Sequence, residues 1–184
     1  MTASQQPEVT EYDGGVVVVD AGYFREDMAA CYLLEAETEV AFIEVGINSS
    51  TPRLMQVLKA RGWQPEDVRY VIVTHVHLDH AGGAGSLMQL LPNATLLVHP
   101  YGARHMIDPA KLELGSRAVY GDELYENIYG ELVPVDEERV QSEFQPEDQA
   151  HRSGGDLAGH REAVGVGCGD VIEDRPECVR EHRV

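Results

Sequence analysis

The chain has 184 residues, 43% of them hydrophobic, which suits one globular domain with a buried core. Its 32 acidic residues outnumber 14 basic residues, and the formal net charge of −18 argues against binding to nucleic acid or to an anionic membrane surface. The sequence has no run of about 18 apolar residues, and Met1–Val9 lacks the charged and apolar regions of a signal peptide, so we expect a cytoplasmic protein.

Three cysteines, Cys31, Cys168 and Cys178, are too few and too scattered for a disulfide framework or a Cys-x-x-Cys metal site. Cys31 lies between Ala30 and Tyr32 in a strand-like run. We therefore expect its thiol to be buried and unreactive.

The first 140 residues alternate between predicted strands and helices, after a flexible tail expected over residues 1–10. Strands are predicted from β-branched and apolar runs at Val16–Val19, Ala30–Leu34, Val40–Val45, Arg69–Thr74 and Thr95–Val98. Helices are predicted from Ser50 to Gly62, over Ser86–Leu91 and Pro100–Ile107, and from Gly121 to Gly130. This alternation predicts an α/β (α+β layered) domain.

Tyrosines accompany the last predicted helix. Tyr120, Tyr125 and Tyr129 fall four to five residues apart, which is typical of a packing stripe; a lid over a binding site is the alternative. His99 and His105 lie upstream, at the end of a predicted strand and in a predicted helix. Lone histidines are more often surface or packing residues than ligands, so neither is included in the predicted site.

The sequence changes character after Val140. Residues 141–184 contain eight large apolar residues among forty-four, with six glycines and no sustained periodicity. Such a stretch buries too little apolar surface to offset the entropy of ordering it. We therefore expect residues 141–184 to be a poorly ordered tail of low apolar content.

The most informative segment is Thr-His-Val-His-Leu-Asp-His-Ala-Gly-Gly at residues 74–83, directly after the apolar run Val71–Val73. The glycines that follow the histidines, Gly82, Gly83 and Gly85, are expected to allow a tight turn into the next helix. The segment is therefore predicted to lie on a strand-to-helix loop.

This loop has the composition of a metal site. In extended backbone, residues two apart point to the same side, so His75, His77 and Asp79 are predicted to converge on one point and His80 to point toward a second. Imidazole and carboxylate groups suit Zn²⁺, and also Fe or Mn. We expect one or two ions, and a hydrolase built around them.

Residues 74–83 resemble the metal-binding loop of the metallo-β-lactamase fold superfamily, which includes glyoxalase II, arylsulfatases, lactonases and ribonuclease Z. The resemblance extends over residues 15–140, where a strand pair, the turn Ile43-Glu44-Val45-Gly46, a helix, the ligand loop and a second helix follow the order of that fold. It implies a metallo-β-lactamase-like αββα sandwich, with residues 11–140 as its N-terminal part and with its C-terminal part incomplete.

The same resemblance implies a ligand set. His75 and His77 would hold the first metal, and Asp79 and His80 the second. Glu44 falls where many members carry an aspartate in a strand-end Asp-x-Gly. A supporting role at the site and a plain acidic turn residue are equally open interpretations of Glu44.

The function implied is that of a metal-dependent hydrolase, in which metal-bound hydroxide attacks a small ester, thioester or lactone-like substrate. Asp79 would be the catalytic residue, orienting the hydroxide and taking its proton. The net charge disfavours the ribonuclease branch of the superfamily. The alternative is a non-catalytic, truncated remnant that binds at most one metal weakly through His75, His77 and His80. An incomplete sandwich would also expose an apolar sheet face and so favour homo-oligomers.

The resemblance further implies that the second half of the fold supplies a third histidine, a bridging aspartate and a last histidine. Gly159-His160 resembles the glycine-histidine pair that often carries the third ligand, and Gly169-Asp170 resembles the glycine-aspartate pair of the bridge, with His182 as a candidate last ligand; neither pair follows a predicted strand. The sequence after Val140 reads as if the usual second half had been cut short or replaced, for example by a shifted reading frame.

Overall fold

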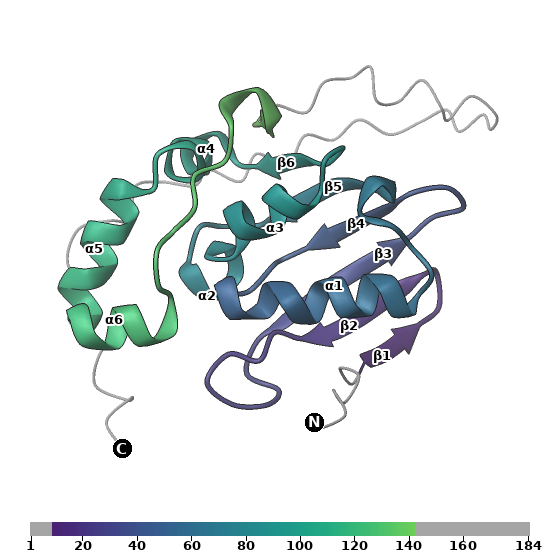
Figure 1. The fold of residues 1–184 in the computed structure, drawn as a ribbon, viewed down its shortest axis with the longest axis horizontal. Helices are drawn as coiled ribbons and strands as arrows, with labels where there is room; N and C mark the ends of the chain where they lie inside the picture. Colours follow the sequence, from purple (N-terminus) through teal and green to yellow (C-terminus); the bar gives the residue numbers. More distant parts are fainter. Residues whose placement is uncertain (1–8, 143–184) are drawn as a thin grey trace, which may run out of the picture. The chain divides into compact units, whose positions relative to one another are not determined.

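The computed structural model describes residues 9–142 as a seven-stranded sheet with helices (Figure 1). Its strands are β1 (Val9–Tyr12), β2 (Val16–Asp20), β3 (Ala30–Glu35), β4 (Val40–Ile43), β5 (Val68–Val73), β6 (Thr95–Val98) and β7 (Val140–Gln141). Its helices are α1 (Thr51–Ala60), α2 (Leu78–Ala81), α3 (Ala84–Leu90), α4 (Pro100–Ile107), α5 (Ala110–Tyr120) and α6 (Asp122–Ile128). The predicted mixed α/β class is confirmed.

The strands lie in the sheet in their order along the chain. The first four are antiparallel neighbours, whereas β4, β5, β6 and β7 pair in parallel. Parallel neighbours need a crossover connection, and here α1 joins β4 to β5, while α2 and α3 join β5 to β6. The carboxyl ends of β4 and β5 therefore lie side by side, and this end of the sheet positions the residues considered below.

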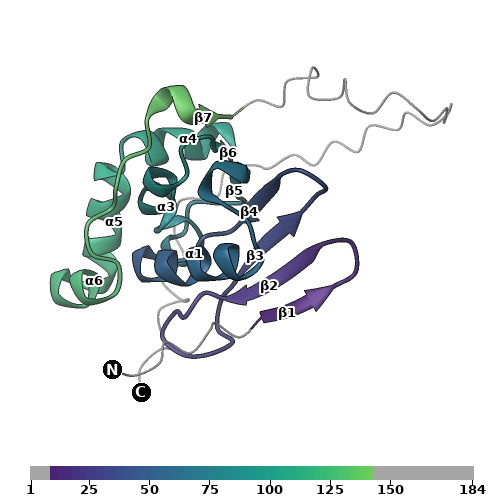
Figure 2. The same ribbon diagram turned by 45° about the vertical axis from the view of Figure 1, so that its right-hand side comes forward.

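One face of the sheet is buried beneath helices, with α1 and α3 lying across it (Figures 1 and 2). The strands bury alternate residues on this side because side chains along a strand point to opposite faces. The fully buried strand residues of this core include Val17, Val19, Leu33, Phe42, Val71 and Leu96. Helix α1 packs Leu54, Val57 and Leu58 against them. Each such side chain contributes roughly 1.5–3 kcal/mol on burial.

Strands β1 and β7 and helices α2 and α5 were not predicted from the sequence. Val9 and Thr10 pair with Val19 and Val18, so strand β1 begins inside the predicted tail of residues 1–10. Helix α5 was not predicted, because it buries no residue and so carries no clear apolar stripe. Its last turn is instead fixed by Arg117, which bonds Glu113 and Glu126 and stacks over the ring of Tyr125.

The tyrosines of the α5–α6 region behave mainly as packing residues, as predicted. Tyr125 and Tyr129 are buried in the core, whereas Tyr120 remains 42% exposed. The hydroxyl of Tyr129 bonds that of Tyr23, at 2.7 Å, which fastens α6 to the loop between β2 and β3. Burial on this scale argues against a lid that opens and closes.

The glycines after the histidines lie at the turn into α3, as predicted, and they also allow close packing. Gly82 and Gly83 have negative φ angles, of −61° and −85°, which any residue can adopt. There is no space for a side chain at these positions. A Cβ at Gly83 would lie 2.7 Å from the Ile47 carbonyl oxygen, and a Cβ at Gly85 would overlap the Val133 carbonyl. Gly82 and Gly83 thus form the expected turn between α2 and α3, and the glycines also permit close backbone packing around these helices.

Cys31 lies in β3 with no exposed surface, as the sequence predicts. Burial raises the pKa of its thiol to about 12, so at neutral pH almost no nucleophilic thiolate forms. In native protein we expect no alkylation of Cys31 by iodoacetamide over hours, and complete alkylation in urea. Peptide mass spectrometry distinguishes Cys31 from the other two cysteines; native labelling of Cys31 would contradict its burial.

Within residues 9–142, no helix is both long and apolar enough to span a membrane.

Candidate metal centre

The centre forms where two parallel strands end together. Glu44 directly follows β4, and His75 lies two residues beyond the end of β5. Ile43 pairs with Ile72, and the Glu44 backbone N–H continues the ladder by donating to the Ile72 carbonyl at 2.9 Å. Ligand sites in α/β proteins are commonly built at the carboxyl ends of parallel strands.

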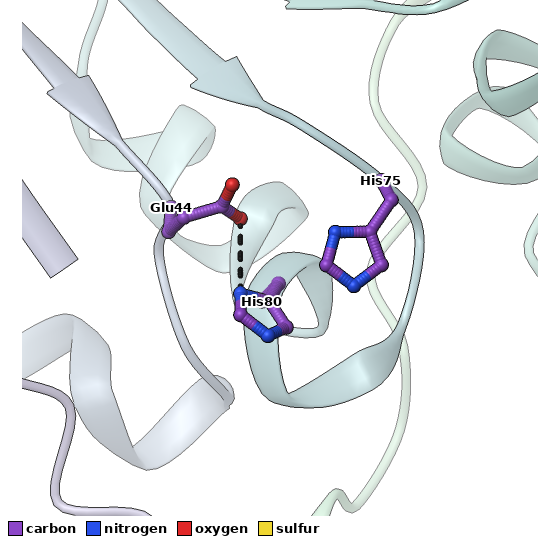
Figure 3. A group of neighbouring side chains, drawn as sticks. All are labelled: Glu44, His75 and His80. Atoms are coloured by element: carbon purple, nitrogen blue, oxygen red, sulfur yellow. Dashed lines mark ion pairs between the residues drawn. The ribbon is translucent and has the colours of Figure 1, made fainter. Parts of the chain in front are cut away.

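Glu44 is held in place from both backbone and side chain. Its φ of +54° lies in the left-handed region, which costs a non-glycine residue about 1–3 kcal/mol. Its side chain is buried, and the Oε1 atom accepts a hydrogen bond of 3.0 Å from the Thr74 backbone N–H. This bond leaves the second carboxylate oxygen, Oε2, free to face the histidines (Figure 3).

His80 faces Glu44 from helix α2. Its Nδ1 atom lies 3.4 Å from Glu44 Oε2, and both atoms are buried without a hydrogen-bond partner. The His80 carbonyl accepts from the Val45 N–H, so the backbones of the two segments are also tied together. Buried polar atoms without partners are rare and call for an explanation such as a bound ion.

His75 completes the group shown in Figure 3. Its ring centroid lies 4.3 Å from that of His80 and 4.7 Å from that of His77. Partial burial, followed by the neighbouring His80 and His77 rings, lowers the pKa of His75 below its usual value. The lowered pKa favours neutral imidazole, which is the form that binds metals.

One ligand atom from each of Glu44, His75 and His80 lies within 4.8 Å of the other two. Two imidazoles and a carboxylate suit Zn²⁺ and similar divalent ions. An ion between Glu44 Oε2 and His80 Nδ1 would also satisfy both of the unpartnered buried atoms. These residues therefore fit a divalent metal ion.

The other two predicted ligands border this group. His77 is exposed at the N-terminus of α2 with its ring edge-on to His75, and Asp79 Oδ2 lies 3.4 Å from His80 Nε2. The four predicted residues His75, His77, Asp79 and His80 are thus neighbours. Their assignment as ligands of two separate ions stays a prediction.

Their geometry differs from the extended loop expected from the sequence. The backbone turns helical at Leu78, so Asp79 and His80 are consecutive on a helix rather than on opposite sides of a strand. His80 consequently faces Glu44, and its ring lies against that of His75. The sequence pattern left the role of Glu44 open; its place at a strand end before Gly46 was the only signal.

The remaining candidates lie elsewhere. His99 caps helix α4, with Nδ1 accepting from the Tyr101 N–H at 3.3 Å, and His105 lines a small cavity with Leu78, Met106 and Leu132. Neither histidine belongs to the metal-binding group, as expected. His160, Asp170 and His182 lie outside the described residues.

Comparison with known proteins gives related sequences. The sequence model of the metallo-beta-lactamase superfamily matches residues 24–175. An N-acyl homoserine lactonase from a Bacillus species is 31% identical, over 32% of this chain and 32% of that protein. Ribonuclease J from Pyrococcus abyssi is 30% identical over 69% of this chain and 26% of that protein. The chain therefore spans about a third of the length of the lactonases it matches.

Solved structures agree on the fold. The SMB-1 metallo-beta-lactamase, bound to 2-mercaptoethanesulfonate, has a TM-score of 0.53 at 22% identity, over 74% of this chain and 46% of its own. The FEZ-1 metallo-beta-lactamase from Legionella gormanii has a TM-score of 0.51 at 21% identity, over 70% of this chain and 44% of its own. By its sequence match and its fold, this chain belongs to the metallo-beta-lactamase superfamily.

Proposed function

We propose that this protein is a metal-dependent hydrolase whose metal is held by Glu44, His75 and His80, with His77 and Asp79 beside them. The observation that carries the proposal is the buried pair Glu44 Oε2 and His80 Nδ1, which lie 3.4 Å apart without a hydrogen bond, next to a histidine whose lowered pKa favours the neutral form. If Glu44 and His80 were a purely structural pair with no bound ion, we would expect Glu44 Oε2 and His80 Nδ1 to form a direct hydrogen bond instead.

A divalent ion bound here would lower the pKa of water to about 7 and polarise a carbonyl group, which supplies a nucleophile and an electrophile at neutral pH. The protein would contribute the rest. Glu44, anchored by the Thr74 N–H, fixes the position of His80. Asp79 is 35% exposed beside His80, so its carboxylate can reach a substrate and accept a proton.

We propose a small ester, thioester or lactone as the substrate, and Zn²⁺ as the metal, with Fe or Mn as alternatives. The lactonase relatives support an acyl substrate, although they match only about a third of their length. The charge of −18 disfavours a polyanionic RNA substrate, despite the likeness to ribonuclease J.

A second candidate function is a non-catalytic protein that binds at most one metal weakly. The observation that favours it is the small number of donors: among residues 9–142, the group that gathers within 4.8 Å has three members. A catalytic zinc site commonly uses three protein ligands and keeps one position for water, so three donors also suffice for the hydrolase.

Metal content and hydrolysis together separate the two functions. We expect purified protein loaded with Zn²⁺ and desalted to retain one to two ions per chain by atomic emission, and to hydrolyse a lactone, a thioester or a p-nitrophenyl ester. Chelation should abolish hydrolysis, and added Zn²⁺ should restore it. Retention of well under one ion together with no hydrolysis would favour the non-catalytic protein and contradict the proposal.

A further inference from the structure

Thr74 contacts two of the residues assigned to the metal. It directly follows strand β5 and directly precedes His75. Its backbone N–H donates to Glu44 Oε1 at 3.0 Å, and its hydroxyl oxygen lies 2.9 Å from His75 Nδ1. One residue therefore touches a carboxylate and an imidazole of the same group, the first through its main chain and the second through its side chain.

The main-chain contact follows from the way the two strands end. Ile43 pairs with Ile72 in parallel, so a regular ladder would next join the Thr74 N–H to the carbonyl of Glu44. At Glu44, whose φ is positive, a carboxylate oxygen takes this acceptor position instead. Any residue with a backbone N–H could make this contact, so it does not depend on the threonine hydroxyl.

The hydroxyl contact bears on the tautomer of His75. A neutral imidazole carries one proton, and only the nitrogen without that proton can bind a metal. Nδ1 is paired with Thr74 Oγ1, which leaves Nε2 as the nitrogen available to an ion. Binding through Nε2 requires the proton on Nδ1, where the Thr74 hydroxyl oxygen can accept it. Because Thr74 is exposed, its own O–H can donate to water at the same time.

We propose that Thr74 is a positioning residue of the metal centre, whose hydroxyl accepts a hydrogen bond from His75 Nδ1–H and so presents Nε2 to the ion. This role rests on the proposed function, since it takes Glu44, His75 and His80 as the group that binds the metal. Metal-binding histidines commonly donate their second ring N–H to a carboxylate, a carbonyl or water, which fixes the tautomer and the ring orientation. Here the acceptor is the side chain of the preceding residue.

His75 depends on such support more than the other two residues of the group, because it is the most exposed of the three. In the described part of the chain, Thr74 is the hydrogen-bond partner of the His75 ring, which also packs against the rings of His77 and His80. Without the bond, a ring this exposed would populate further rotamers, and metal binding would have to select the productive one. Threonine suits the role because branching at its Cβ restricts χ1.

Thr74→Val removes the hydroxyl but keeps the branched Cβ and the backbone N–H that bonds Glu44. We expect this variant to lower the affinity for Zn²⁺ about 10–100-fold, the range typical of groups that act through a metal ligand. Thr74→Ser keeps a hydroxyl on an unbranched Cβ and should stay within about threefold of the unmodified protein. Thr10→Val, at an exposed position in β1, is the matched control and should leave the affinity unchanged. Competition of the full chain with a fluorescent zinc chelator measures each affinity.

A spectroscopic signature separates positioning from a general loss of structure. In the full chain with ¹⁵N-labelled histidine and saturating Zn²⁺, we expect nuclear magnetic resonance to show a metal-bound Nε2 on His75 and a protonated Nδ1 whose proton exchanges slowly with water. In Thr74→Val, Nε2 should remain metal-bound while the Nδ1 proton exchanges too fast to be detected, and Thr74→Ser should restore its signal. The signals missing from His75→Gln assign the resonances. A metal-bound Nδ1 on His75 in the unmodified protein would overturn the proposal.

The zinc competition also distinguishes failure of this role from failure of the proposed function. If the unmodified protein binds no Zn²⁺, or if His80→Ala binds it as tightly, the metal centre is wrongly assigned and Thr74 has no such role. If His80→Ala loses affinity while Thr74→Val matches the Thr10→Val control, the metal centre is supported and the role of Thr74 is wrong. Equal losses in Thr74→Val and Thr74→Ser would also overturn it, because the loss would then not depend on the hydroxyl.

Discussion

His80→Ala is expected to lower the affinity for Zn²⁺ at least a hundredfold, the largest effect of any single substitution at the metal centre. His80 is the side chain on which the group converges: Glu44 faces its Nδ1 atom, Asp79 its Nε2 atom, and the His75 ring packs against it. Removing it deletes one ligand and also the contact that aligns the carboxylate of Glu44. Competition with a fluorescent zinc chelator measures the affinity.

Two other histidines serve as controls. His99 and His105 are also partly or fully exposed, but they lie at the start and near the end of α4, away from the metal-binding group. His99→Ala and His105→Ala should retain the affinity of the unmodified protein within about twofold. Equal affinity of His80→Ala and these controls would show that the metal binds elsewhere, provided circular dichroism shows that all three variants are folded.

Glu44→Gln tests whether this residue is a ligand. Glutamine keeps an oxygen that can accept from the Thr74 N–H, but it replaces Oε2 with an amide nitrogen that cannot bind a metal. If Glu44 is a ligand, Glu44→Gln should lower the affinity for Zn²⁺ almost as much as His80→Ala does. A loss of about 10–100-fold, clearly smaller than that of His80→Ala, would instead indicate a residue that positions His80, since removal of such a residue typically costs 10–100-fold.

Local patterns in the sequence predict much of the fold. Strand β6 and helix α4 have the predicted bounds, because an apolar run followed by His99-Pro100 marks both the strand end and the helix start. Strand β1 was missed because Thr10 and Tyr12 are exposed at the sheet edge and lack the alternation of a half-buried strand. Helix α5 was missed because its stability depends on ion pairs rather than on an apolar stripe.

The candidate site was predictable only in part. The cluster His75 to His80 is contiguous in the sequence, so its metal-binding character could be recognised from residue types and spacing. Glu44 lies over thirty residues away, and its contact with His80 depends on the parallel pairing of β4 with β5. The one-turn helix that reorients Asp79 and His80 depends on close packing of Gly83 against Ile47. Long-range contacts of this kind have no signature in a single sequence.

Gly85→Ala is expected to destabilise the protein by about 2–3 kcal/mol, within the range usual for overpacking a tightly packed interior. Gly85 is buried in α3, where its Cα faces the Val133 carbonyl closely enough that a Cβ would overlap it. The segment containing Val133 cannot easily retreat. Its neighbour Val135 donates to the Met106 carbonyl at 2.9 Å, and Asn48 Nδ2 donates to the Glu131 carbonyl at 2.8 Å.

Gly115→Ala makes the same chemical change as Gly85→Ala, but we expect it to stabilise the protein. Gly115 lies in the middle of α5, and among residues 9–142 no atom outside its own helix backbone and chain neighbours lies within 4 Å of the position that a Cβ would take, so alanine meets no obstacle there. Since alanine is favoured over glycine in a helix interior by about 0.5–1 kcal/mol, this variant should be more stable than the unmodified protein. Urea unfolding followed by circular dichroism compares the two. Gly85 and Gly115 are both helical glycines, so the two variants gain the same helix propensity. If Gly85→Ala were stabilising, α3 would not pack against Val133 as described. Close packing would then not explain the glycines that follow the histidines.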